Sequence, residues 1–369
     1  MSPLLFGQPP FPISPDGALS QFKIDVPDDE VQKLKTLLEV LPIPRPNWEN
    51  GHKDQSCGIP RDWLVESVDY WQNKYNCIPQ FKVEVQDDDG QKYSVHFAAL
   101  FSENKDAIPI HLSHGWPGSF IEFMPILLKL KEQYASSPEK LPYHVIVPSI
   151  IGFGFSSPPP LDKDFIIKDN CRLFHKAMLA LGFGKRGYIT QGGDLGGPIA
   201  ETLAAVYEPA KAAHLNIYFI PSTAASGEPA DPLEKKAIEK GKKFLQTGMA
   251  IGEKMLEWPD PAHVPSLDTI LTNVSIYWFT GTFPTSIWCY RALLSGAPET
   301  AYEPITNGKP KGLSWFPYEI GAVPKEFIRN DKNITHFYEH HEGGHFAALE
   351  VPDLLWADFE DFIAKVWKQ

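Results

Sequence analysis

The sequence predicts an α/β protein with a mostly parallel, doubly wound sheet, a helical extension before it and a helical insertion within it. Three observations support this prediction. Strand-like and helix-like segments alternate from about residue 82 to residue 220, a helical and aromatic stretch follows, and the strand pattern returns near the C-terminus. Alternating strands and helices indicate βαβ units with parallel strands. In such sheets the chemistry lies at the carboxyl ends of the strands.

The composition is that of a globular protein with a sizeable core, because 43% of the 369 residues are hydrophobic and 12% are aromatic. The net charge of -12 and the absence of a basic cluster argue against nucleic acid or an anionic membrane surface as a partner. The first 15 residues resemble neither a signal peptide nor a membrane anchor. Four scattered cysteines predict buried, reduced thiols. We therefore expect a soluble, cytoplasmic protein.

Residues 1–95 are predicted to form a mostly helical extension that packs on the core and on the helical insertion, residues 221–304, which we call the lid. The segment VQKLKTLLEVL, residues 31–41, carries apolar residues at helical spacing behind an acidic start. A second helix is expected over residues 60–76, where a partly aromatic stripe indicates a packing surface.

The core and the lid follow this extension. Residues 96–220 are expected to form the first half of the core, residues 221–304 a helical lid, and residues 305–369 the second half. Strands are predicted at 92–101, 108–114, 144–150, 187–191, 214–220 and 333–340, and core helices at 120–134, 171–182, 196–209 and 352–367.

The segment RGYITQGGDLGGPIAETLA, residues 186–204, is the most informative stretch. It places G-x-D-x-G between a predicted strand and a predicted helix, which is the context of a nucleophile elbow with Asp194 in place of serine. The glycines leave room for a strained turn. The alternative is that Asp194 only caps the helix. A carboxylate nucleophile attacks an electrophilic carbon, such as that of an epoxide or an alkyl halide, and the resulting ester needs a general base for hydrolysis.

The base is expected in a histidine after the last strand. His345 follows the Gly-Gly pair of HEGGH, whereas His340 and His341 fall at the predicted strand end. HEGGH also matches the H-E-x-x-H zinc motif, but that interpretation needs a helix, in which two glycines would cost about 2 kcal/mol relative to alanine. We therefore interpret the segment as a loop and not as a zinc site. Hydrolysis through an aspartate ester needs no metal and no organic cofactor, so we expect neither.

The acid that orients the histidine remains open by pattern alone. The candidates are Glu319, Glu326, Asp331 and Glu339, and Glu319 lies where a strand would end. In an elbow fold, backbone N–H groups of the residue after the nucleophile and of an early strand loop form the oxyanion hole. Here these residues are Leu195 and, in HGWPG, Trp116.

The elbow, HGWPG and EGGHFAALE together resemble the microsomal-type epoxide hydrolases, and especially their soluble fungal members. The resemblance covers nearly the whole chain, including the N-terminal VPDDEVQKLKTLL and PRDWLVESVDYW segments. It implies the α/β-hydrolase fold, an epoxide substrate that reacts with water to give a vicinal diol, and a homodimer formed through the lid. Microsomal relatives carry a membrane anchor, for which this sequence offers no candidate.

Carried over by motif, the resemblance makes Asp194 the nucleophile, His345 the base and Glu319 the acid. It also implies two lid tyrosines that protonate the epoxide oxygen, and Tyr290 in SIWCYR matches the second. The first has no counterpart, because Ala250 runs directly into Ile251 where the family's segment is expected. Either the lid is truncated there or a segment is missing from the printed sequence; we favour a missing segment, since both flanks match the family.

Two other functions remain as alternatives. Haloalkane dehalogenases share the aspartate elbow but generally lack the extension and GGHFAALE, and a catalytically inactive α/β-hydrolase binding module would not need the elbow carboxylate, the hinge histidine and the lid tyrosine together. Aromatic residues indicate an apolar pocket for aryl or alkyl epoxides, with burial in the core as the alternative. These pocket candidates, besides Trp116, are Phe153, Phe155 and Phe219.

Overall fold

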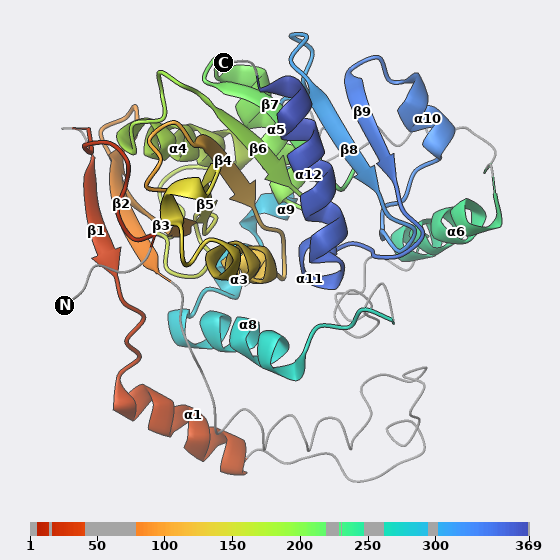
Figure 1. The fold of residues 1–369 in the computed structure, drawn as a ribbon. Coiled ribbons are helices and arrows are strands. Elements are labelled where there is room, and N and C mark those ends of the chain that lie inside the picture. Colours follow the sequence, from red (N-terminus) through yellow and green to blue (C-terminus); the bar gives the residue numbers. More distant parts are fainter. Residues whose placement is uncertain are drawn as a thin grey trace.

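The computed structural model of the chain describes residues 6–14, 17–40, 79–218, 229, 231–246, 262–293 and 302–367. These residues form a nine-stranded sheet in the order β1-β2-β3-β5-β4-β6-β7-β8-β9 (Figure 1). β5, β4, β6, β7, β8 and β9 run parallel, and β1, β2 and β3 continue the sheet antiparallel beside β5. The strands are β1 Ala18–Phe22, β2 Gln80–Gln86, β3 Lys92–Leu100, β4 Ile108–Ser113, β5 Tyr143–Pro148, β6 Tyr188–Gly192, β7 Ala210–Leu215, β8 Lys311–Trp315 and β9 Ile334–Glu339.

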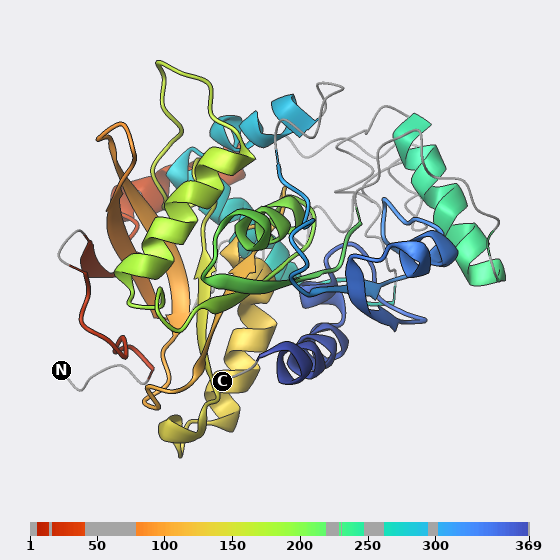
Figure 2. The same ribbon diagram turned by 90° about the horizontal axis from the view of Figure 1, so that it is seen from above.

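Helices cover both faces of the sheet (Figure 2). On one face lie α4 (Ile167–Ala180) and α5 (Gly196–Val206), and on the other lie α3 (Met124–Gln133), α11 (Ala347–Glu350) and α12 (Pro352–Val366). β5 and β6 are buried along their whole length. Such two-sided burial explains why these parallel strands are continuous apolar runs in the sequence.

The lid lies over the carboxyl ends of the parallel strands (Figure 1). Its described helices are α6 (Pro232–Gln246), α8 (Leu267–Thr280) and α9 (Trp288–Leu293), with the short 3-10 helix η4 (Pro284–Ser286) between the last two. Within the described residues the other helices are α1 (Asp28–Val40), α10 (Lys325–Asn330), η2 (Phe120–Phe123) and η3 (Pro138–Lys140). None of the described helices is long and apolar enough to cross a membrane.

The structure confirms the mostly parallel sheet with helices on both faces, but several elements differ from the prediction. β1, β2 and β8 were not predicted, and the expected boundary after residue 95 falls inside β3. The strand expected at 214–220 lies earlier, at Ala210–Leu215, because its alanines gave a weak strand signal. The helix expected at 60–76 lies outside the described residues.

Candidate active site

Asp194 occupies the sharp turn between β6 and α5, as the elbow motif predicts. Its φ of 47° lies in the left-handed region, which is strained for a residue with a side chain. A Cβ atom on Gly192 would lie 2.1 Å from the Gly196 carbonyl oxygen, and one on Gly196 would lie 1.9 Å from the Ser113 carbonyl oxygen. Glycine is therefore required on both sides, and the turn presents a buried carboxylate at the carboxyl end of the sheet.

Three groups from distant parts of the chain contact this carboxylate. The Trp116 backbone N–H donates to Oδ1 at 2.7 Å, and the Tyr290 hydroxyl donates to the same oxygen at 3.0 Å. His345 Nε2 lies 3.0 Å from the other oxygen, Oδ2. The two oxygens of Asp194 thus have different environments.

His345 lies in the loop between β9 and α11, and HEGGH is not helical. Gly343 has a φ of 82°, and a Cβ atom there would lie 2.4 Å from a methyl group of Val351. His341 and Glu342, the other members of the zinc motif, are exposed. The interpretation of this segment as a hinge loop is therefore confirmed, and no group of residues suited to a metal ion is found in the described part of the chain.

Glu319 is the acid that the structure places beside His345. Its Oε1 lies 2.7 Å from His345 Nδ1 and also accepts the Gly321 N–H at 3.0 Å. Because an ionised carboxylate only accepts hydrogen bonds, the Nδ1–H of His345 donates to Glu319, and this contact orients the ring so that Nε2 faces Asp194.

The other three candidate acids are engaged elsewhere or exposed. Glu326 is exposed. Asp331 accepts the Tyr218 hydroxyl at 2.6 Å, and Glu339 pairs with Lys325 at 2.6 Å. Their positions leave Glu319 as the partner of the histidine.

Tyr290 comes from α9 and is partly buried, with its ring packed against the core. Burial raises the pKa of its phenol well above the usual value, and the Asp194 charge and hydrogen bond raise this pKa further. The hydroxyl is therefore protonated and able to donate at neutral pH. The family's first lid tyrosine was expected near Ala250, which lies outside the described residues.

The HGWPG turn follows β4 and carries the Trp116 N–H. His114 secures its start, because Nδ1–H donates to the Gly115 carbonyl oxygen at 3.0 Å and Nε2 accepts the Ile150 N–H at 3.2 Å. Burial lowers the pKa of His114 to about 4, so the ring is neutral as this pattern requires. Leu195, the other predicted oxyanion donor, is buried directly after Asp194 where α5 begins.

The predicted pocket aromatics lie in different places. Phe153 is fully buried, with its ring edge-on to those of His114 and Tyr277. Phe155 lines a groove of about 390 Å³ between the loop after β5 and the end of α8. Phe219 lies outside the described residues.

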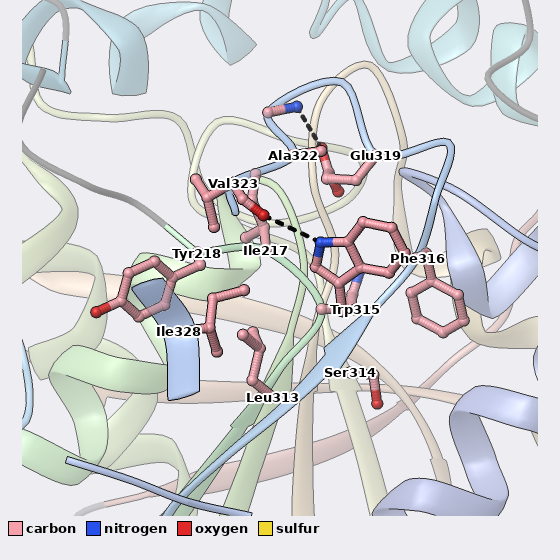
Figure 3. A pocket seen from close by; sticks show the side chains of 12 residues that line it. Ile217, Tyr218, Leu313, Ser314, Trp315, Phe316, Glu319, Ala322, Val323 and Ile328 are labelled. Carbon is pink, nitrogen blue, oxygen red and sulfur yellow. Dashed lines mark hydrogen bonds between the residues drawn. The ribbon is translucent and has the colours of Figure 1, made fainter. Parts of the chain in front are cut away.

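A small cavity is lined by Glu319 and by residues at the ends of β7 and β8 (Figure 3). Its volume of about 10 Å³ would hold a single water molecule, so it is too small for an organic substrate. Figure 3 also shows Glu319 accepting the Gly321 N–H and the Trp315 indole donating to the Val323 carbonyl oxygen. These contacts fix the loop that carries the acid.

Sequence reasoning missed Asn216, which links the strand ends to the histidine loop. Asn216 Nδ2 donates to the His345 carbonyl oxygen at 3.3 Å, and its Oδ1 accepts the Gln191 amide at 2.9 Å. A buried amide directly after β7, beside the elbow strand, was the signal that could have identified it.

Comparison with known proteins gives the same family by several routes. The family model "Epoxide hydrolase N terminus" matches residues 19–123, and the model "alpha/beta hydrolase fold" matches residues 108–231. A curated protein of Dothistroma septosporum, named "Putative epoxide hydrolase", is 35% identical over 384 residues, which cover 93% of this chain and 89% of that protein. Epoxide hydrolase 1 of Sus scrofa is 28% identical over 96% of this chain and 90% of its own length.

Among solved structures, the Aspergillus niger epoxide hydrolase superposes with a TM-score of 0.82. It is 35% identical, and the match covers 98% of this chain and 100% of that one. Full-length similarity at this level, together with an elbow aspartate in contact with a histidine and a tyrosine, leads to one conclusion: the chain belongs to the epoxide hydrolase family of the α/β-hydrolase fold and is an epoxide hydrolase.

Proposed function

We propose that this enzyme converts epoxides to vicinal diols through a covalent ester on Asp194. One observation supports this mechanism above the others: one oxygen of the Asp194 carboxylate accepts two hydrogen bonds, and the other faces the base His345. This arrangement separates the oxygen that is to be stabilised from the oxygen that is to react.

In the first step, Oδ2 of Asp194 attacks one carbon of the epoxide ring. The carbon–oxygen bond of the ring breaks, its electron pair goes to the ring oxygen, and Tyr290 transfers its proton to that oxygen. The Tyr290 hydroxyl, which donates to Asp194 in the free enzyme, turns to the epoxide when substrate is bound. The product of this step is a hydroxyalkyl ester.

In the second step, water attacks the carbonyl carbon of the ester while His345 Nε2 accepts a proton from the water. Glu319 balances the charge of the imidazolium that forms. The negative oxygen is Oδ1, which the N–H groups of Trp116 and Leu195 stabilise. When this intermediate collapses, the bond between the carbonyl carbon and Oδ2 breaks, and the second proton of the water passes to Oδ2, which leaves as a hydroxyl of the diol and restores the Asp194 carboxylate. The proton on His345 passes to the tyrosinate left by the first step.

Two variants and one control test this assignment with styrene oxide as the substrate. Asp194→Ala should form neither ester nor diol, because the nucleophile is gone. His345→Gln should still open the ring but not hydrolyse the ester, so that intact-protein mass spectrometry detects the protein plus one epoxide. His341→Gln, an exposed histidine of the same loop, should keep the parent activity. A normal diol yield from either of the first two variants would refute the mechanism.

The family resemblance also leads us to propose a homodimer formed through the lid. The scattered cysteines, read as reduced thiols, support the further proposal of a cytoplasmic location.

A further inference from the structure

Helix α8 of the lid contacts the HGWPG turn through two side chains one helical turn apart. Asn273 Nδ2 donates to the Pro117 carbonyl oxygen at 2.7 Å, and the Tyr277 hydroxyl donates to the Gly118 carbonyl oxygen at 2.7 Å. Positions i and i+4 lie on the same face of a helix, which lets both reach consecutive carbonyls. We call Asn273 and Tyr277, with these two carbonyl groups, the α8 latch.

Two neighbouring contacts strengthen the latch. Ser119, which follows the turn, donates its hydroxyl to Asn273 Oδ1 at 2.6 Å and so fixes the orientation of the amide. The Trp116 indole N–H donates to the Ser286 hydroxyl at 2.9 Å, in η4 of the lid. The lid therefore holds the turn at its side chain and at its backbone.

The core holds the same turn from its other side. Glu122, which is 3% exposed in η2, accepts the Gly115 N–H at 3.0 Å. The peptide unit that carries the Trp116 N–H thus lies between a core anchor at Gly115 and the α8 latch at Pro117 and Gly118. With both neighbours fixed, the direction of this N–H toward Asp194 Oδ1 is fixed as well.

We propose that Asn273 and Tyr277 are positioning residues for ester hydrolysis, through which the lid helix aims the Trp116 N–H at the oxygen that becomes negative. This inference deepens the proposed function and rests on it. The second step is the sensitive one, because Oδ1 loses negative charge when Asp194 is alkylated and gains it when water attacks the ester. A misdirected donor therefore slows hydrolysis and leaves ring opening intact.

The predicted effect is selective. Removing a donor to an oxyanion outright costs about 100-fold to 1000-fold in rate, and a loosened donor costs part of that, about 10-fold. When hydrolysis slows in a two-step covalent mechanism, kcat and KM fall together, while kcat/KM, which reports ring opening, keeps its value. A purely structural role would instead lower the amount of active enzyme, so that kcat and kcat/KM would fall in parallel.

The test uses Tyr277→Phe, which removes a single oxygen atom, and Asn273→Ala. Trp278→Phe is the control, because this neighbour on α8 is 48% exposed. Ester formation and ester decay are measured separately with styrene oxide by rapid quench and intact-protein mass spectrometry, and the melting temperature verifies folding. We expect ester decay to slow about 10-fold in both variants, unchanged ester formation, and parent behaviour in the control.

The inference is overturned if ester decay in both folded variants equals that of the parent, or if ester formation and decay slow equally. These outcomes differ from failure of the proposed mechanism itself, in which no ester would form even in His345→Gln.

Discussion

At the scale of single residues, the site depends on how Tyr290 is enclosed. Its ring meets that of Trp116 edge-to-face at 5.7 Å, and its hydroxyl donates to Asp194. The burial and the nearby carboxylate both favour the neutral phenol over the phenolate. The tyrosine therefore keeps its proton across the whole pH range in which enzymes are usually assayed.

The raised pKa of Tyr290 predicts the pH dependence of ring opening. The pKa of Tyr290 is raised above 10, so its active, protonated form persists below that raised value and is lost only above it. We expect no decline of kcat/KM from this group between pH 7 and pH 10, and about a 100-fold loss of ring opening in Tyr290→Phe. A descending limb below pH 10 that disappears in Tyr290→Phe would contradict this account; stopped-flow measurement of ester formation would detect it.

The sequence alone could single out Asp194 and His345 as site candidates, because flanking glycines mark both positions, and the structure brings the two side chains into contact. Glu319 and Tyr290 needed the family resemblance, since several carboxylates and aromatic residues occur near each. The residues that position these groups could not be predicted from the sequence, for a physical reason. Asn216, Asn273 and Tyr277 bond to backbone carbonyls 129, 156 and 159 residues away, so no local pattern distinguishes them from other polar residues.

At the scale of elements, the elbow depends on the close contact between the start of α5 and the end of β4. Gly196 permits this approach, and the space between its Cα and the Ser113 carbonyl oxygen is too small for a methyl group. Gly308 differs, because its surroundings are open although its φ is 78°. Gly196 is therefore required because there is no room for a side chain, whereas Gly308 is favoured only by its backbone conformation.

We predict that Gly196→Ala destabilises the protein by about 3 kcal/mol, since the obstructing atom belongs to the backbone and cannot rotate away. Gly308→Ala should cost only about 1 kcal/mol from its left-handed backbone. Urea unfolding of both variants would measure these costs. Equal values for the two would mean that the helix can shift to accommodate the methyl group.

The strands differ in how well they can be predicted from their sequences. β5 and β6 are covered on both faces and read as continuous apolar runs. β1 is mostly exposed at the sheet edge, and β8 begins with Lys311 and Gly312, so neither carries such a run. Lys311 is nevertheless buried, because its ammonium pairs with Glu201 at 3.0 Å. A buried ion pair of this kind places a charged residue inside a strand, so the strand is not predicted from a run of apolar residues.

At the scale of the whole molecule, the N-terminal part and the catalytic core share a single sheet. β1, β2 and β3 lie beside β5 and complete the sheet on that side. The aromatic rings of Phe81 and Phe97 stack across β2 and β3 at 5.4 Å within one buried cluster. The order of strands in space could not be derived from their order along the chain.

A chain that starts at residue 96, at the predicted domain boundary, should therefore fail to fold. It would lack β1, β2 and the first half of β3, and the remaining half of β3, which pairs with β5, would lose its partner β2 and become an exposed edge of the sheet. We expect aggregation and no cooperative thermal transition by circular dichroism. Unfolding at the midpoint of the parent would show that the first 95 residues are a separable attachment.

The unequal environments of the two Asp194 oxygens determine which atom of the enzyme is exchanged in each catalytic cycle. Under the proposed mechanism the atom at Oδ2 leaves with every diol, and an atom from solvent takes its position. The atom at Oδ1 stays with Trp116 throughout. The enzyme thus gives away and regains one atom of its own covalent structure in each cycle, while the adjacent atom remains from synthesis to degradation.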